Sequence, residues 1–259
     1  MKVENVKKIK LGSMYINDEA VGPASDAEGE SAIRLGDTVP GKELRWIQVG
    51  NMLVADRCAC FGVRWDTMNE LGYIFGTVVQ IDGRPYLCRS LRIGERITDP
   101  NEWDSLLEQF GEDNRRWHWK KAFFFGQESL PRHPEFCVIR GYNEAKFWHN
   151  WKKSDYSPGV GFRPVLEPII PDLSDLAVGS NIKVVGPHGN FVEGIFAGFD
   201  DYDLTLTVGT MLSGESDWIT LNDQQIVAAR SAIIGITKSP PTSGCPITVI
   251  GQCGMETEL

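Results

Sequence analysis

The residue types best suited to contacting a ligand lie between residues 142 and 157. Tyr, Trp and His alternate there with Asn, Lys and Ser, and Pro158 and Gly159 supply a turn. Tyr and Trp offer large rigid contact areas, whereas Asn, Ser and Lys offer adaptable polar groups. The segment therefore predicts a ligand-contacting surface. The alternative is a surface hairpin whose aromatic rings fold back onto the domain.

Ten side chains of this segment are the candidate ligand-binding residues. We expect a loop or irregular hairpin, with some rings pointing inward and others exposed beside polar groups. Trp148 and Trp151 would share a face if the stretch made a helical turn. The candidates are Tyr142, Asn143, Lys146, Trp148, His149, Asn150, Trp151, Lys152, Lys153 and Tyr156.

Two strand-like runs, 136–139 and 161–166, frame this segment and position it. Arg140 follows the first run and Arg163 lies within the second. Because both arginines belong to the framing strands, we expect them to be at least partly buried, with their guanidinium groups on backbone carbonyls or carboxylates.

The framing sequences VIRG and VGFRPVL, with the Asn- and aromatic-rich stretch between them, resemble a known family. They are similar to the closing part of the C-type lectin-like fold in the branch of formylglycine-generating enzymes and diversity-generating retroelement variable proteins. That branch also includes short phage and mobile-element proteins. The resemblance covers 138–166 well and 35–127 less well. It implies that the two strands flank a ligand-facing segment.

A second unit over about 174–238 has some five short strands separated by turns, which predicts a small β-barrel. The sequences VEGIFAGFDDYDLTL and ARSAIIGI resemble the Sm-like (SH3-like) barrel. Sm proteins that grip RNA have an Asn and an Arg-Gly pair where this chain has Asp203 and Arg230-Ser231. Residues 172–238 carry nine acidic and three basic side chains, which repel phosphate. We therefore expect a scaffold or a homo-oligomerisation module.

Helical signals at 66–72 and 98–111 among many strand-like runs predict an α+β protein. Trp117 and Trp119 would lie on one face of a strand as core residues. Alternatively, Trp117 or His118 would form the base of a pocket beside residues 142–156. The predicted organisation is an N-terminal strand and mobile loop (1–34), a C-type lectin-like domain (35–167), a linker (168–173), an Sm-like barrel (174–238) and a tail (239–259).

Composition sets the limits on function. The chain has 259 residues, 42% of them hydrophobic and 24% charged, with a net charge of −9. That charge disfavours phosphate binding by the whole molecule. No apolar run approaches a membrane span, and the N-terminus lacks the apolar region of a signal peptide. We expect a cytoplasmic protein with no membrane partner and with reduced cysteines.

The chemistry-bearing residues predict neither an enzyme nor a cofactor. Formylglycine-generating enzymes bind copper through a cysteine pair, but Cys137 has no partner in 110–136. Cys58 and Cys60, with Cys88 and Cys137, are the only candidates for zinc, and no C-x₂-C pair is present. His149 is the one histidine inside the aromatic segment, and a triad is defined by geometry rather than by sequence. We expect no catalytic residue and no metal.

Three functions follow, in order of preference. The first is recognition of a protein or other macromolecular partner through 142–157, as the resemblance implies. The second is nucleic-acid or nucleotide binding, since 140–163 holds five basic and two acidic residues. The third is a formylglycine-generating oxidase. The second function would use the cations Arg140, Lys146, Lys152, Lys153 and Arg163, with bases stacked on Trp148 and Trp151.

Overall fold

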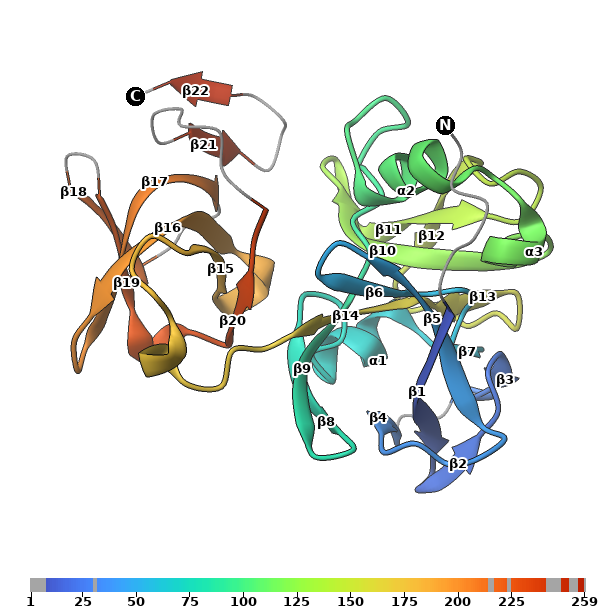
Figure 1. Ribbon diagram of the computed structural model, residues 1–259. Helices are drawn as coiled ribbons and strands as arrows, with labels where there is room; N and C mark the ends of the chain where they lie inside the picture. Colours follow the sequence, from blue (N-terminus) through green and yellow to red (C-terminus); the bar gives the residue numbers. More distant parts are fainter. Residues whose placement is uncertain are drawn as a thin grey trace. The chain divides into compact units, whose positions relative to one another are not determined.

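The chain folds into two compact units in the computed structural model (Figure 1). The first unit is Met1–Leu166 and the second is Glu167–Leu259. Each unit has its own hydrophobic core, so each is described separately. The structure describes residues 8–29, 32–213, 217–222, 225–240, 248–251 and 256–258.

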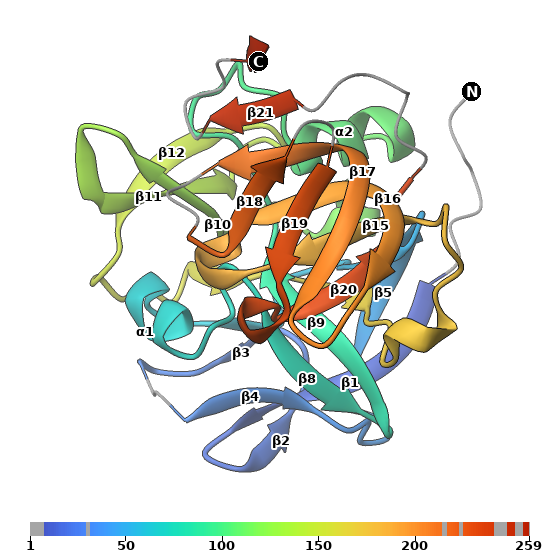
Figure 2. The same ribbon diagram turned by 90° about the vertical axis from the view of Figure 1, so that its left-hand side faces the viewer.

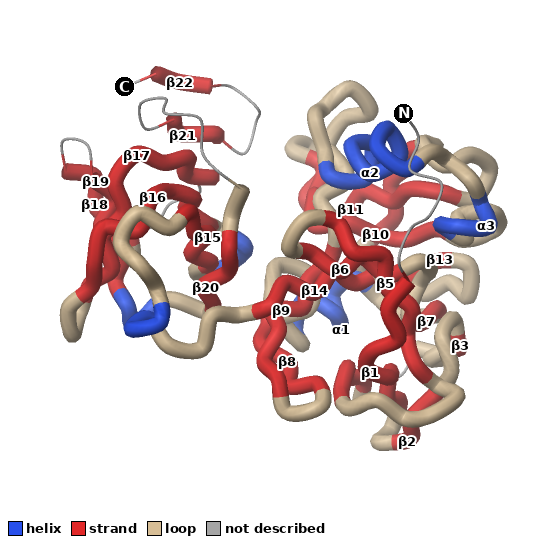
Figure 3. Tube along the Cα trace, in the orientation of Figure 1, coloured by secondary structure: helices blue, strands red, loops and turns tan. Residues whose placement is uncertain are grey.

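The protein is mostly β, so the α+β class predicted from the sequence is wrong (Figure 3). The described residues contain three short α-helices: α1 (Trp65–Glu70), α2 (Glu102–Phe110) and α3 (Asn114–Trp117). The helical signals therefore marked real helices, but paired strands fill most of the chain around them. Trp117 ends α3 instead of lying on a strand. No helix among the described residues has the length and apolar character needed to span a membrane.

The first unit contains an eight-stranded sheet in the order β2-β1-β5-β6-β14-β9-β8, with β4 also paired to β1. The part of the N-terminal segment that was expected to be a mobile loop carries β2 and the short strand β3. The β8–β9 hairpin turns at Asp82 and Gly83, which both have positive φ, as the Asp-Gly signal predicts. The strands are β1 (Lys8–Ile16), β2 (Glu19–Val21), β4 (Ile33–Gly36), β5 (Glu43–Val49), β6 (Met52–Ala55), β8 (Thr77–Ile81), β9 (Arg84–Ser90) and β14 (Pro164–Pro168).

A six-stranded sheet in the order β12-β11-β10-β13-β7-β3 completes the first unit. One face packs on a core that includes Phe125, Ile139 and Phe162, and the other on a core that includes Trp103 and Phe124. Neighbouring residues of one strand thus enter different cores, as the two-residue period requires. The strands are β3 (Ser25–Asp26), β7 (Cys60–Phe61), β10 (Phe123–Leu130), β11 (His133–Gly141), β12 (Trp148–Lys152) and β13 (Val160–Phe162).

The second unit is an all-β barrel-like sheet in the order β18-β19-β17-β16-β15-β20, and Figure 2 shows its strands curling around their own core. The expected linker, 168–173, is bound to this sheet, because Ile170 N donates to Ile236 O. In the tail, β21 (Thr248–Gly251) pairs in parallel with β17 and carries β22 (Glu256–Glu258), whereas Cys245 and Cys253 lie outside the described residues. The other strands are β15 (Asn181–Val185), β16 (Phe191–Phe199), β17 (Asp203–Ser213), β18 (Ile219–Asn222), β19 (Gln225–Ala229) and β20 (Gly235–Lys238).

Candidate recognition surface

The predicted ligand-facing segment folds as the β11–β12 connection, the edge strand β12 and the loop after it. The β12 strand pairs with β11 without a register shift, with His149 opposite Ile139 and Trp148 opposite Arg140. Because a strand has a period of two, Trp148 and Trp151 point to opposite faces of the sheet. They would have shared a face only in a helical turn, which this stretch does not form. Trp148 packs beside the core around Trp103, and Trp151 beside the other core.

Four partly exposed rings form a continuous row on the Trp151 face of this sheet. Phe123 and Tyr142 are stacked, with ring centroids 4.8 Å apart and planes 7° apart. Phe147 lies 6.1 Å from Phe123 and 6.3 Å from His149. His149 and Tyr142 are exposed, while Phe123 and Phe147 are half-buried. We call Phe123, Tyr142, Phe147 and His149 the aromatic row.

Tyr142 is held in a backbone conformation that bulky residues rarely adopt. Its φ is +77°, in the left-handed region. Three backbone hydrogen bonds fix it there: Tyr142 N donates to Trp119 O (2.9 Å) and Ala122 O (3.1 Å), and Lys121 N donates to Tyr142 O (2.9 Å). The side chain is 41% exposed. The fold thus imposes backbone strain that places an exposed ring on Phe123, and such strain clusters at functional sites.

Arg140 holds the β11–β12 connection from beneath, and its predicted burial is confirmed. The guanidinium donates to Ile93 O (3.0 and 2.9 Å) and Lys146 O (2.8 Å), and it pairs with Asp104 at 3.0 Å. Burial lowers the pKa of Arg140, and Asp104 opposes that shift. Trp103 Nε1 also donates to the connection, at Ala145 O (2.7 Å). Helix α2 therefore positions the polypeptide under the aromatic row.

Arg163 is likewise buried, as predicted, and stays away from the surface. It donates to Trp117 O at 2.6 Å, and its guanidinium carbon lies 4.9 Å from the Trp103 ring centroid and 4.5 Å from that of Phe124. Its Nε and Nη1 have no hydrogen-bond partner among the described residues. Two of the five cations proposed for nucleic-acid binding, Arg140 and Arg163, are thus buried and inaccessible to a ligand.

The candidates at the C-terminal end of β12 and after it are anchored by contacts within the fold. Lys153 Nζ lies 4.1 Å from the centre of the Trp65 ring, and burial lowers its pKa. Trp151 Nε1 donates to Asp155 O at 3.2 Å. Tyr156 is 40% exposed. Its ring packs closely on Gly62, where an added Cβ would lie 3.0 Å from Tyr156 Cε2. These side chains thus have structural contacts, although Tyr156 also faces solvent.

The remaining candidates are polar or basic side chains around the row. Asn143 and Lys152 are exposed, and Lys146 and Asn150 are half-buried. Within the described chain, none of these four side chains makes a hydrogen bond or ion pair. They are therefore available to a ligand.

Sequence reasoning missed the contribution of residues 119–123 to this surface. Lys120 forms a parallel bridge with Tyr142, so exposed Lys120 and Lys121 lie beside the row. Phe123 opens a Phe-Phe-Phe run whose other two members are core residues, and no local signal separates it from them. His118 does not lie at the base of this surface. Its Nε2 lies 2.7 Å from Arg57, and Trp117 is fully buried.

The four described thiols do not support a copper site or a nucleophile. Cys58, Cys60, Cys88 and Cys137 are all buried. Burial raises the pKa of Cys58 to about 11 and that of Cys137 to about 12, and it raises the pKa of the other two further. No group of three or more His, Cys, Asp or Glu with metal-binding geometry occurs among the described residues.

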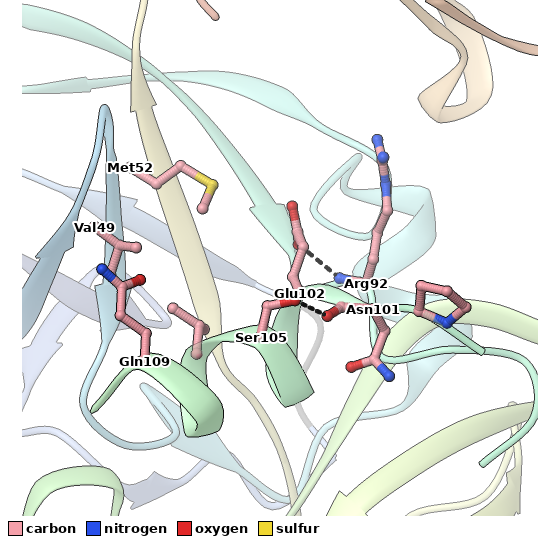
Figure 4. Close-up of a pocket in the computed structure, with 9 residues that line it drawn as sticks. Val49, Met52, Arg92, Asn101, Glu102, Ser105 and Gln109 are labelled. Carbon is pink, nitrogen blue, oxygen red and sulfur yellow. Dashed lines mark hydrogen bonds between the residues drawn. The ribbon is translucent and has the colours of Figure 1, made fainter. Parts of the chain in front are cut away.

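A pocket of about 360 Å³ lies between α2 and the β5–β6 hairpin, apart from the ten candidates (Figure 4). The carboxylate of Glu102 lines this pocket and is held by hydrogen bonds. Arg89 donates to both of its oxygens, and Arg92 N donates to one of them. Burial acts to raise its pKa, but these charges and hydrogen bonds hold the pKa at about 2. Glu102 is therefore a structural ion-pair partner. The lining residues are Val49, Met52, Arg92, Pro100, Asn101, Glu102, Ser105, Leu106 and Gln109.

The resemblances to the C-type lectin-like fold and the Sm-like barrel stay predictions. Comparisons with protein-family models, with curated proteins and with solved structures gave no significant match. The local geometry of the recognition surface is thus the basis for assigning a function.

Proposed function

We propose that this protein is a non-enzymatic binding protein that recognises a protein or other macromolecular partner through the aromatic row and its polar surroundings. The observation that carries the proposal is Tyr142, an exposed ring held at φ +77° and stacked on Phe123. Backbone strain of this kind costs about 1–3 kcal/mol and is found preferentially at functional sites. The barrel is proposed as a scaffold or oligomerisation module.

The composition of the surface supports this proposal. Tyr, Trp and Arg dominate binding hot spots, and the energetically important side chains lie amid polar neighbours that exclude water. Here exposed Tyr142 and His149 are surrounded by the unpaired Asn143, Lys146 and Asn150. A partner that covers the row would bury the rings and supply hydrogen-bond partners for these polar groups.

Single-stranded nucleic acid is the second candidate, because Lys120 and Lys121 lie beside the stacked Phe123–Tyr142 pair. Bases stack on aromatic side chains in basic grooves, and every base has the required flat face. The burial of Arg140 and Arg163 weakens this candidate, since it leaves three of the five predicted cations near the surface. The protein's net charge of −9 also opposes it.

A binding screen with matched variants tests the proposal. The full chain is immobilised and probed with fractionated protein extracts, glycans and single-stranded oligonucleotides. We expect a protein or glycan ligand whose affinity falls at least tenfold in the double variant Tyr142→Ala/His149→Ala. Val78→Ala, a change at an exposed residue of β8, serves as control. Equal binding by both variants contradicts the proposal. A ligand whose binding weakens steeply with salt indicates nucleic acid instead.

A further inference from the structure

The edge strand β12 presents an unpaired hydrogen-bonding edge. Gly141 N donates to Phe147 O, and Lys153 N donates to Glu135 O. In an antiparallel ladder the direction of these groups alternates, so the N–H and C=O groups of Trp148, Asn150 and Lys152 point away from β11. Among the described residues, only Lys152 O has a backbone partner on that side, Asp155 N at 3.0 Å.

This edge lacks the devices that usually block strand addition. Its five-residue ladder has no bulge and no proline, and Lys152 is its one charged residue. Some other edges of the first unit are short or held by side-chain contacts. The edge strands β2 and β3 have three and two residues. At the β8–β9 turn, Asp82 accepts from Thr38 N (2.9 Å) and donates to Asp37 (2.7 Å). The five-residue edge strand β8 (Thr77–Ile81) also lacks proline and bulges, but it has none of the aromatic and basic residues that β12 contains.

The sequence of β12 complements itself in an antiparallel pairing. When two copies pair about a twofold axis at Asn150, Trp148 lies opposite Lys152 and His149 opposite Trp151. Trp–Lys pairs gain cation–π energy, and facing aromatic residues stabilise neighbouring strands. In this register Trp148, Asn150 and Lys152 occupy hydrogen-bonded positions. About four backbone hydrogen bonds then form between the two copies, even when Lys152 O keeps its hydrogen bond from Asp155 N. A shift by two residues in one direction would place Lys152 opposite Lys146, a like-charge pair, and in the other direction would place it opposite Asn150, which removes the Trp148–Lys152 contact.

From this edge and its self-complementary register, we propose that β12 pairs with β12 of a second copy of the chain, joining two six-stranded sheets across a twofold axis. This symmetric contact is the commonest kind in homodimers. It differs from assembly through the barrel. His149 belongs to the aromatic row, so the two rows become neighbours on one continuous face. A partner with two contact points would then bind with avidity.

The proposed contact is small, so the expected dimer is weak. Stable interfaces bury about 1,200 Å² or more, and one five-residue strand pair supplies less than that. We expect a dissociation constant between about 1 μM and 1 mM. Sedimentation velocity of the full chain over a range of concentrations measures it.

Asn150→Pro tests the contact selectively. Proline removes an N–H that points away from β11, and edge strands tolerate proline in that orientation. We expect the melting temperature to stay within a few degrees while association weakens at least tenfold. Asn150→Ser keeps the N–H and should associate like the wild type. A wild-type chain that remains monomeric up to about 1 mM contradicts the proposal. So does association that Asn150→Pro leaves unchanged.

A disulfide test checks the register, and it holds even if the proline variant fails to fold. Asn150 lies opposite its own copy, within bridging distance, so Asn150→Cys should form a covalent dimer on mild oxidation. The two copies of residue 152 would lie about 13 Å apart, since each strand residue advances about 3.3 Å, so Lys152→Cys should not cross-link. The wild type, with the same native thiols, is the control. Cross-linking of Lys152→Cys but not Asn150→Cys contradicts the proposal.

Discussion

At the residue scale, the fold holds the backbone of Tyr142 in a conformation that non-glycine residues disfavour. A glycine adopts its φ of +77° at no steric cost, whereas any side chain is strained there. We therefore expect Tyr142→Gly to be more stable than Tyr142→Ala by about 1 kcal/mol, although both lose the ring. Urea unfolding of the two variants measures this difference. Equal stabilities would show that the backbone at 142 relaxes freely.

Arg140 is the residue on which the recognition surface rests. It holds Ile93 O, Lys146 O and the Asp104 carboxylate from a fully buried position. Arg140→Ala should lower the free energy of unfolding by about 3–5 kcal/mol, because Asp104 loses its cation and two backbone carbonyls lose a hydrogen-bond donor. Arg140→Lys should rescue little, because an ammonium does not match the fork geometry. Arg45→Ala, an exposed change, should stay within about 0.5 kcal/mol.

The burial of both arginines could be predicted from sequence, since each lies in or next to one of the two strand-like runs that frame the 142–157 segment. The exposure of Phe123 could not be predicted. Its neighbours Phe124 and Phe125 are core residues of identical type, and only the non-local bridge between Lys120 and Tyr142 sets it apart.

At the element scale, the ion pair between Glu102 of α2 and Arg89 makes the stability of the protein depend on pH. The pKa of Glu102 lies at about 2, below its ordinary value of 4.5. A depressed folded-state pKa gives stability that is complete above about pH 4.5 and is lost as the pH falls toward 2. Glu102→Gln should therefore be less stable than the wild type at pH 6, and the difference should shrink at pH 3. Urea unfolding at both values tests this. A difference that stays constant would exclude the ion pair as the cause.

Elements with a strong local period were predictable, and the edge strand was not. The hairpin around Asp82 and Gly83 and the strand 181–185 follow from turn residues and β-forming runs. Strand β12 reads as Trp-His-Asn-Trp-Lys, with no alternation of apolar and polar residues. Edge strands pack on only part of each face, so their sequences do not show the pattern that marks a central strand.

At the scale of the whole molecule, the second unit contains a buried ion pair between its first residue, Glu167, and Lys183. Lys183 Nζ lies 2.5 Å from Glu167 Oε2, and Thr237 also donates to Glu167. Lys183→Ala should destabilise this unit by about 3–5 kcal/mol, because the buried carboxylate loses its cation. Hydrogen exchange should show faster opening of β15–β20 while β10–β12 stay protected. Equal acceleration in both units would mean that they unfold together.

The division into two units had a compositional signal, because aromatic residues give way to an acidic, strand-rich stretch after residue 166. The sheet orders had no such signal, since pairs such as β14 with β6 join residues far apart in sequence. The α+β prediction was wrong for a related reason. Helices can be recognised from local sequence signals, whereas strands form through pairing between residues far apart in sequence, so their number was underestimated.

Recognition through the aromatic row is the central claim, and site-specific photo-cross-linking in the cells that produce the protein tests it most directly. A photoreactive phenylalanine analogue replaces Tyr142 on the row, or Ile97, which is 62% exposed outside it, as the control. We predict one defined partner cross-linked from position 142 and not from position 97, and lost when Phe147→Ala is added. Identical cross-linked products from both positions, or none from 142, would contradict the account.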